Sequence, residues 1–195
     1  MKTIFIMRHG QTDWNIHRRL QGQMDIPLNE EGIAQAKEAG DRFAAAGLRF
    51  DTVIASTLSR AVDTAVLSTG CEREAVIQDP RLVEIGYGDY EGTFYSQVTG
   101  ELMAFIRDPE NVPPPATVET IPALMARTGA FLEDLKSVDG ESILVVTHGV
   151  TIRALMGHLT GPRNAVVWGM PIHNCQLITT TLKDGEYSDA VLYDK

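Results

Sequence analysis

The sequence predicts an α/β sandwich built on a mainly parallel central sheet. Short apolar runs, which are typical of buried strands, alternate along the chain with longer segments of helical periodicity. Strands separated by helices are the pattern of βαβ units, in which successive strands run parallel. The 195 residues, 44% of them hydrophobic, suit one domain with a full core. We therefore expect a single domain over residues 1–195.

The first half of the chain predicts three strands and two helices. Between the first strand and the first helix, residues 10–27 are polar and irregular, and long loops of this kind are often functional. Asn29 is a typical N-cap for the first helix. Ser56 or Thr57 would cap the second helix, which puts Arg60 in its first turn. The expected elements are strands at 3–7, 52–55 and 76–78, and helices at 30–46 and 58–67.

The second half continues the alternation after a glycine-rich loop. Residues 94–107 have a helical pattern, and the proline-rich stretch 108–115 then interrupts it. Residues 121–135 show a clear helical period. The remaining expected elements are a strand at 143–146, closing strands at 176–182 and 188–193, and, after His148, a helix that carries Ile152, Leu155, Met156 and Leu159.

Composition excludes several classes of protein. The net charge of −9 argues against a general binder of nucleic acid or anionic membranes, because such proteins present basic faces. The two cysteines, Cys71 and Cys175, form no CxxC pair, so neither a disulfide scaffold nor a zinc-finger spacing is expected. No apolar run is long enough for a signal peptide or a membrane span. We therefore expect a soluble, cytoplasmic protein.

Four charged or titratable residues lie at or just after the ends of predicted strands. Arg8 and His9 follow the first strand, Arg60 opens the helix after the second, and His148 follows the strand at 143–146. In open parallel sheets, ligands bind beyond the carboxyl ends of the strands. We therefore expect these four side chains to converge.

The residue types in this set indicate a site for a phosphoryl group. Arg8 offers a planar fork suited to phosphate oxygens, and Gly10 allows the backbone to approach a ligand closely. Arg60 opposes the dipole of its own helix, a conflict that a bound anion would resolve. His148 repeats the His-Gly plan before another helix N-terminus.

These groups could carry out phosphoryl transfer without a metal. A neutral imidazole can act as the nucleophile and form a covalent intermediate, while cations neutralise the phosphoryl oxygens. Glu84 is the candidate acid for the leaving group, with a pKa that partial burial would raise. The sequence contains no P-loop, HExxH or EF-hand loop, so we expect no metal and no cofactor.

Five segments together resemble the histidine phosphatase superfamily, also called the phosphoglycerate mutase-like family. The segments occur in the family's order from the first strand to about Arg153. The resemblance implies a three-layer, phosphoglycerate mutase-like sandwich. The segments are MRHGQTDWN, GQMDIPLNEEG, STLSRAVDTA, RLVEIGYGDYEG and VTHGVTIR.

The resemblance also implies roles for individual residues. His9 would be the phosphorylated nucleophile, and Glu84 would protonate the leaving group and then help to activate water. The phosphoryl oxygens would be held by Arg8, Asn15, Arg60 and His148, and the pocket would be bordered by Gln21, Gly22 and Gln23. Nothing is assigned to His173, Asn174, or the two threonines that follow the His-Gly pairs, Thr12 and Thr151.

Residues 93–120 bear on the choice between branches of the family, and we expect them to form an excursion over the active site. Mutases of the family carry additional basic residues there for the carboxylate of phosphoglycerate. This segment has one basic residue, Arg107, against four acidic ones. We therefore favour a phosphatase of small phosphomonoesters, such as α-ribazole phosphate, sugar phosphates or nucleotides.

Two alternatives remain open at this point. One is a phosphoglycerate mutase that interconverts 2- and 3-phosphoglycerate. The other, of a different class, is a non-catalytic module that binds a phosphorylated ligand. Such a module would be expected to have lost His9, Glu84 or His148, and all three are present. The only partner that we expect is a small phosphorylated substrate, and a homodimer is one of the oligomeric states that the sequence allows.

Overall fold

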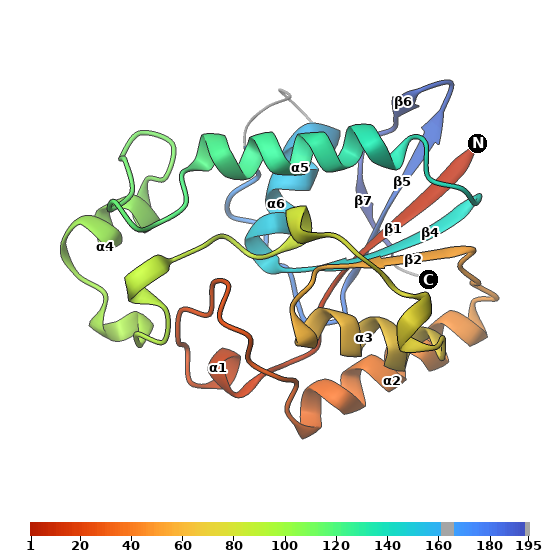
Figure 1. Ribbon diagram of the computed structural model, residues 1–195, viewed down its shortest axis with the longest axis horizontal. Helices are drawn as coiled ribbons and strands as arrows, with labels where there is room; N and C mark the ends of the chain where they lie inside the picture. Colours follow the sequence, from red (N-terminus) through yellow and green to blue (C-terminus); the bar gives the residue numbers. More distant parts are fainter. Residues whose placement is uncertain (161–165, 194–195) are drawn as a thin grey trace.

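The computed structural model describes residues 1–160 and 166–193, and its centre is a seven-stranded sheet (Figure 1). The strand order is β3-β2-β4-β1-β5-β6, with β7 paired to β5. The strands are β1 (Lys2–Arg8), β2 (Thr52–Ala55), β3 (Ile77–Gln78), β4 (Ser142–Thr147), β5 (Leu177–Lys183), β6 (Glu186–Tyr187) and β7 (Val191–Leu192).

The four strands β3, β2, β4 and β1 pair in parallel, whereas β5 is antiparallel to β1. The two short strands β6 and β7 are antiparallel to β5. The sheet is therefore mainly parallel, as predicted. The expected strand at 188–193 is shortened to β7, and β6 was not predicted from the sequence.

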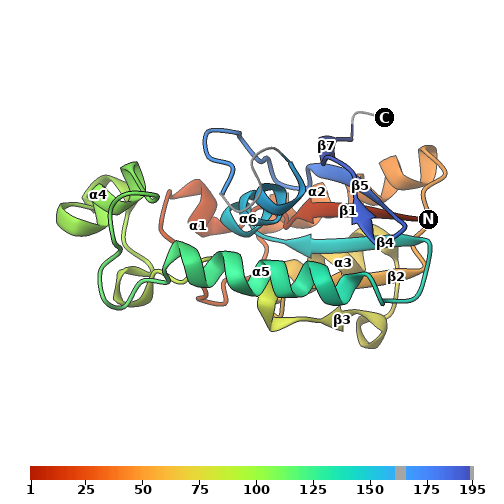
Figure 2. The ribbon, with the colours of Figure 1, turned by 90° about the horizontal axis from the view of Figure 1, so that it is seen from above.

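Helices cover both faces of the sheet and make three layers (Figures 1 and 2). On one side lie α2 (Glu30–Ala45) and α3 (Ser59–Thr69), and on the other α5 (Ile121–Leu135) and α6 (Gly149–Leu159). Successive side chains of a strand point to opposite faces. In β1, accordingly, Ile4 and Ile6 join the core under α5 and α6, while Phe5 and Met7 join the core under α2 and α3.

The register of the parallel strands aligns their carboxyl ends. Arg8 pairs with Thr147, and Ala55 pairs with Val146. The residues directly after β1 and β2 continue the pairing with β4. The backbone N–H of His9 donates to the Thr147 carbonyl (2.9 Å), and that of Ser56 donates to the Val146 carbonyl (2.9 Å). Residues 9, 56 and 148 therefore leave the sheet side by side at one edge.

A third apolar cluster lies beyond this edge. It joins the loop after α1 (Asp13–Ile16) to α4 (Gly100–Arg107) and to the sides of α5 and α6 that face them. Figure 1 shows α4 at the end of the molecule, beyond α1 and the start of α5. The buried members are Leu20, Ile85, Val98, Leu102, Phe105, Val118, Leu124, Met125, Ala154 and Val166.

Two local predictions from the sequence are wrong. The helix expected at 94–107 begins only at Gly100, after a 3-10 turn at Tyr95–Gln97, because Gly100 adopts a left-handed φ of 60° that interrupts a continuous helix. Neither Ser56 nor Thr57 caps α3, whose N-cap is Leu58 without a side-chain hydrogen bond.

The prediction for α2 is confirmed at its start, since the Asn29 side chain accepts a hydrogen bond from the Gly32 N–H (2.8 Å).

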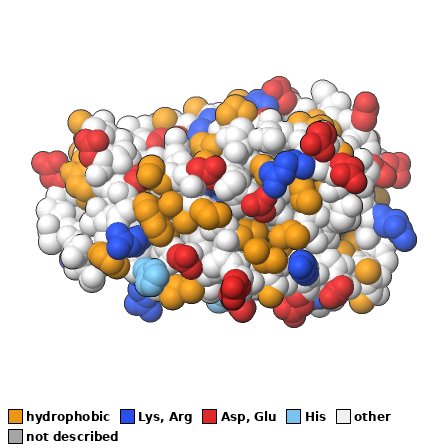
Figure 3. Space-filling view, turned by 60° about the horizontal axis from the view of Figure 1, so that its bottom comes forward, with side chains coloured by type: hydrophobic (Ala, Val, Ile, Leu, Met, Phe, Trp, Pro, Cys, Tyr) orange, Lys and Arg blue, Asp and Glu red, His pale blue; other side chains and the backbone are white. Residues whose placement is uncertain are grey.

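Among the described helices, none is long and apolar enough to cross a membrane. On the face shown in Figure 3, acidic and basic side chains are interspersed among apolar ones.

Candidate active site

His9 is buried directly after β1, and hydrogen bonds to both its backbone N–H and its carbonyl fix its position. Its N–H donates to Thr147, and its carbonyl accepts a hydrogen bond from Nδ2 of Asn174 (2.8 Å). The ring Nδ1 lies 2.6 Å from the carbonyl oxygen of Gly10. A carbonyl only accepts, so Nδ1 must carry the hydrogen, and the lone pair of the neutral ring is on Nε2. This tautomer leaves Nε2 ready to act as a nucleophile.

Gly10 fits where a side chain would not. A Cβ at this position would lie 2.5 Å from the carbonyl oxygen of Gly32, in the first turn of α2. The Gly10 N–H donates to Oγ1 of Thr64 (2.9 Å), and that hydroxyl in turn donates to the Arg60 carbonyl (2.6 Å). The backbone after His9 is thus fixed between α2 and α3.

His148 lies opposite His9 and is completely buried at the N-cap of α6. The two ring centroids are 5.0 Å apart with an interplanar angle of 57°. Nε2 of His148 is 2.8 Å from Oγ of Ser56, whose oxygen also accepts from the Leu58 N–H (3.3 Å). The hydroxyl hydrogen of Ser56 is therefore available for donation to Nε2 of His148. When Nε2 accepts this hydrogen bond, Nδ1 carries the hydrogen of the neutral imidazole.

The two predicted arginines are tied to backbone carbonyls. Arg60 is completely buried and donates to the carbonyls of Gly22 (2.9 Å) and Met24 (2.7 Å), so it anchors the loop that carries them. Arg8 donates through Nη1 to the Ile172 carbonyl (2.6 Å). Each guanidinium therefore has a fixed orientation.

Buried polar atoms without a hydrogen-bond partner occur in this cluster. Within the described ranges they are Nε of Arg8, Nε of Arg60, Nδ1 of His148 and Oε1 of Gln21. An unsatisfied buried polar group costs about 1–3 kcal/mol. Three of these atoms are nitrogens on residues predicted to hold phosphoryl oxygens. Their arrangement suits an anionic ligand that accepts hydrogen bonds.

The electrostatics of the cluster keep both imidazoles neutral. Burial, followed by the positive charges of Arg60 and Arg8, holds the pKa of His9 well below its ordinary value of 6.5. Burial and the same arginines also lower the pKa of His148. Burial lowers the pKa of Arg60 to about 10, although the nearby Glu84 charge opposes that shift. The site therefore combines neutral imidazoles with two cations.

Glu84 is placed at the N-terminus of α6, beside both arginines. Its carboxylate accepts hydrogen bonds from the backbone N–H groups of Ile85 (3.0 Å), Val150 (3.1 Å) and Thr151 (3.1 Å). The Thr151 hydroxyl lies 3.3 Å from the same oxygen. The predicted acid is thus held firmly at a helix N-terminus, where a carboxylate is favourable.

Asn15 and Gln21 meet at Thr12 on the other side of the site. Thr12 and Asn15 form a capping box that starts α1. Nε2 of Gln21 donates to Oγ1 of Thr12 (2.6 Å). Gly22 adopts a left-handed φ of 51°, and the exposed Gln23 donates through Nε2 to the Glu84 carbonyl (3.2 Å). The predicted border residues are therefore linked to both the capping box and the acid-bearing loop.

Several residues of this arrangement were missed from the sequence. Ser56 was expected to cap a helix, and Asn174, Thr12 and Thr151 received no role. The shared His-Gly-x-Thr spacing was a usable signal, since both threonines are completely buried and support site residues. Thr64 had no such signal, because its contact with Gly10 depends on how α3 packs on the sheet.

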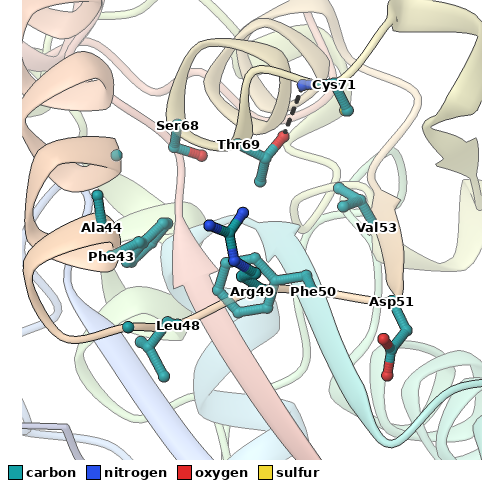
Figure 4. Close-up of a pocket in the computed structure, with 12 residues that line it drawn as sticks. Phe43, Ala44, Leu48, Arg49, Phe50, Asp51, Val53, Ser68, Thr69 and Cys71 are labelled. Carbon is teal, nitrogen blue, oxygen red and sulfur yellow. Dashed lines mark hydrogen bonds between the residues drawn. The ribbon is translucent and has the colours of Figure 1, made fainter.

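A separate pocket lies where α2 ends and β2 begins, at the amino end of that strand. It has a volume of about 520 Å³, and Figure 4 shows the Arg49 side chain extending between Phe43, Phe50 and Thr69. None of the site residues predicted from the sequence lines it. The candidate chemistry is therefore at the carboxyl edge of the sheet.

Comparison with known proteins agrees with the predicted family and fold. Residues 4–194 match the histidine phosphatase superfamily (branch 1), and the chain belongs to that superfamily. Its relatives include both phosphatases and phosphoglycerate mutase-like proteins. The predicted membership and fold class are confirmed.

Three relatives illustrate this range. A 2,3-bisphosphoglycerate-dependent phosphoglycerate mutase from Brucella anthropi is 37% identical over 172 residues, 82% of each chain. The Bacillus subtilis protein named uncharacterized phosphatase PhoE is 29% identical over 191 residues, 97% of this chain and 90% of its own. A mutant phosphoserine phosphatase from Entamoeba histolytica, solved in complex with phosphoserine, has a TM-score of 0.82 at 26% identity and covers 100% of this chain and 96% of its own.

Proposed function

We propose that the protein is a metal-independent phosphatase that hydrolyses small phosphomonoesters through a phosphohistidine on His9. The observation that carries the proposal is the set of buried, unpartnered nitrogens of Arg8, Arg60 and His148 around a neutral His9. These donors would satisfy phosphoryl oxygens, and Nε2 of His9 would face the phosphorus.

The first step transfers the phosphoryl group to the enzyme. Nε2 of His9 forms a bond to phosphorus while the bond from phosphorus to the ester oxygen breaks. The departing oxygen takes a proton from Glu84. Arg8, Arg60, His148 and Asn15 stabilise the charge that spreads over the three equatorial oxygens.

The second step returns the enzyme to its starting state. A water molecule attacks the phosphohistidine and gives one proton to the Glu84 carboxylate. The bond between phosphorus and nitrogen breaks, inorganic phosphate leaves, and His9 is again neutral. Because the arginines and His148 supply the positive charge, no step needs a metal ion.

Two features support hydrolysis over mutase activity. Arg107, the one basic residue in the proposed excursion at 93–120, is exposed at the last turn of α4. A surface pocket lined in part by the predicted border residue Gln23 contains Glu91 and Glu119, the latter paired with Arg127, and no basic side chain among its lining residues. A margin without a basic side chain disfavours the doubly phosphorylated primer that a mutase of this family would have to hold.

The names of the relatives suggest the first compounds to test. Phosphoserine and 3-phosphoglyceric acid are the ligands of the Entamoeba histolytica phosphoserine phosphatase structures. A panel should include these two together with sugar phosphates, nucleotides and α-ribazole phosphate.

The deciding experiment combines turnover with trapping of the intermediate. The wild-type protein should release inorganic phosphate from panel members and should carry label on His9 after rapid quenching with a 32P-labelled substrate. The His9→Ala variant should show neither. Rapid interconversion of 2- and 3-phosphoglycerate with a 2,3-bisphosphoglycerate primer, without net phosphate release, would identify a mutase. Phosphate binding without any turnover would identify a non-catalytic module.

A further inference from the structure

Side chains from other elements hold the loop segment that carries Glu84. Each of the four consecutive backbone carbonyls of residues 81–84 accepts a hydrogen bond from such a side chain. The position of Glu84 therefore depends on residues that lie far away in the sequence. The donors, in the order of the carbonyls, are Arg127 (2.5 Å), Thr147 (2.6 Å), Thr151 (2.7 Å), and at Glu84 both Arg127 and Gln23 (3.2 Å each).

Arg127 of α5 connects the two ends of this segment. Its Nη1 donates to the Arg81 carbonyl, and its Nη2 donates to the Glu84 carbonyl. The other side of the guanidinium faces Glu119, whose Oε1 accepts from Nε (2.7 Å) and whose Oε2 accepts from Nη2 (3.0 Å). Because every nitrogen of this planar group has a partner, the guanidinium is fixed in one orientation.

Glu119 is bound to the same loop two residues after Glu84. Its Oε2 accepts a hydrogen bond from the Gly86 N–H (3.1 Å), and its own N–H donates to the Gly86 carbonyl (2.8 Å). The side chains of Arg127 and Glu119 are only 15% and 16% exposed. A sheltered pair of this kind is costly to break from one side, because the remaining charge then lacks its partner. The contacts form a closed ring from Glu84 through Arg127 and Glu119 to Gly86.

Glu84 is therefore fixed at both its carboxylate and its backbone carbonyl. The N-terminus of α6 holds the carboxylate, through the N–H groups of Val150 and Thr151, and Arg127 of α5 holds the carbonyl. Proton transfer needs the acid within hydrogen-bond reach of the ester oxygen. A misplacement of about 1 Å can reduce the rate by about a hundred-fold. A side chain that fixes the backbone of the acid can thus govern proton transfer without contact with the substrate.

We propose that Arg127, oriented by Glu119, is a positioning residue for the general acid Glu84. The proposal rests on the phosphatase function proposed above. Loss of the guanidinium releases the Glu84 carbonyl, so the carboxyl group loses its alignment with the departing oxygen. The affected event is the transfer of the proton from Glu84 to the ester oxygen as the bond from phosphorus to that oxygen breaks. The cations around His9 stay in place.

The competing explanation is that the ion pair only fastens α5 to the loop. That role would lower stability and reduce activity toward all substrates alike. A positioning role instead depends on the leaving group, because an alkoxide needs the proton whereas 4-nitrophenolate departs readily without it. The quantity to compare is kcat/KM, which covers the steps up to release of the leaving group and excludes hydrolysis of the phosphohistidine.

The experiment measures kcat/KM for phosphoserine and 4-nitrophenyl phosphate in the wild type and in variants of the pair. Arg127→Gln should lower the value for phosphoserine by about ten-fold to a hundred-fold, and that for 4-nitrophenyl phosphate by less than about three-fold. Arg127→Lys should restore part of the loss, since it keeps the charge but not the planar fork. Glu119→Gln should show the same selectivity with a smaller loss. Glu84→Gln, which removes the acid, should show the same selectivity with a larger loss.

Arg81→Gln is the matched control. It removes a guanidinium from the same segment, but its ion pairs are with Asp79 and Asp134. It should lower the denaturant midpoint without making the enzyme selective for the better leaving group. The same selectivity in Arg81→Gln would show that any weakening of the segment has this effect, and would overturn a specific role for Arg127.

The remaining outcomes separate the positioning role from the proposed function. Equal losses for both substrates in Arg127→Gln, or weaker inhibition by vanadate than in the wild type, would overturn the positioning role and leave the phosphatase intact. If Arg127→Gln does not fold, Arg127→Lys and Glu119→Gln decide the question. If phosphoserine is not hydrolysed, the fastest alkyl phosphate of the panel replaces it. Failure of the wild type to hydrolyse any phosphomonoester would instead reject the proposed function.

Discussion

Oγ of Ser56 lies 2.8 Å from Nε2 of His148, and both side chains are completely buried. The contact joins the residue after β2 to the residue after β4. If Ser56 donates to Nε2, Nδ1 is the nitrogen that offers a hydrogen to the phosphoryl group.

Ser56→Ala should therefore lower kcat by about ten-fold, since one oriented hydrogen bond is worth about 1 kcal/mol and 1.4 kcal/mol corresponds to a factor of ten in rate. Steady-state hydrolysis of phosphoserine or a chromogenic phosphomonoester measures the change. Thr57→Ala, which removes an exposed hydroxyl at the next position, is the matched control. An unchanged kcat in Ser56→Ala would show that the hydroxyl does not orient His148.

The stability of the free protein should fall as the pH drops below about 6.5. His9 and His148 have lowered pKa values in the folded state, so below the ordinary value of 6.5 the unfolded chain binds more protons than the folded one. Each histidine can then cost up to about 1.4 kcal/mol per pH unit until its folded pKa is reached. Urea unfolding between pH 7 and pH 5 measures this slope.

The variant to compare is His148→Asn, whose free energy of unfolding should depend less steeply on pH than that of the wild type. His17→Asn, at an exposed position, should keep the wild-type slope. Burial also lowers the pKa of His158, but that contribution is the same in all three proteins. The carboxyls of Asp51 and Asp79 titrate below their ordinary value of 3.8, outside this range. Identical slopes in wild type and His148→Asn would contradict the prediction.

Gly10→Ala should destabilise the protein strongly and abolish activity. The new Cβ would lie 2.5 Å from the Gly32 carbonyl oxygen, so either the loop or the start of α2 has to shift. Overpacking of this kind costs about 1–3 kcal/mol. Gly47→Ala is the control, because that glycine has a left-handed φ but open space around it, and the substitution should cost only about 1 kcal/mol. Denaturant midpoints report both values.

Activity should survive removal of divalent metals, because side-chain cations neutralise the phosphoryl group. Turnover in EDTA should match that in untreated enzyme. Vanadate should inhibit competitively and should stabilise the protein by about 2.7 kcal/mol at a hundred times its Kd. Thermal unfolding with and without vanadate measures this, and Arg60→Gln should lose most of the stabilisation. A strict need for a divalent ion would reject the mechanism.

The core strands and the start of α2 could be predicted because each has a local signal. Apolar runs identified β1, β2 and β4, and Asn29 marked the helix that follows it. The end of the sheet could not be predicted in detail, since β6 and β7 are two residues each and depend on pairing with β5. The helix expected at 94–107 was wrong because periodicity does not reveal the left-handed backbone at Gly100.

The site residues that could be predicted are those that lie in recognisable sequence motifs at the ends of predicted strands. Arg8, His9, Arg60 and His148 were expected at the carboxyl edge, and the structure brings the two imidazoles within 5.0 Å. The catalytic and binding roles remain predictions that the experiments above test. The contacts of Ser56 and Thr64 could not be found from the sequence, because they connect segments that only the packed sheet brings together.

The parallel pairing of β1 with β4 makes assembly of the site inseparable from strand alignment. Arg8 faces Thr147 in the ladder, so His9 and His148 are in place only when every pair behind them is in register. A slip of one residue would reverse the inward and outward sides of β1 and turn the nucleophile away. The first and last thirds of the chain must therefore pair in the sheet before the site can catalyse a reaction. Recovery of turnover during refolding would report on this long-range pairing of β1 with β4.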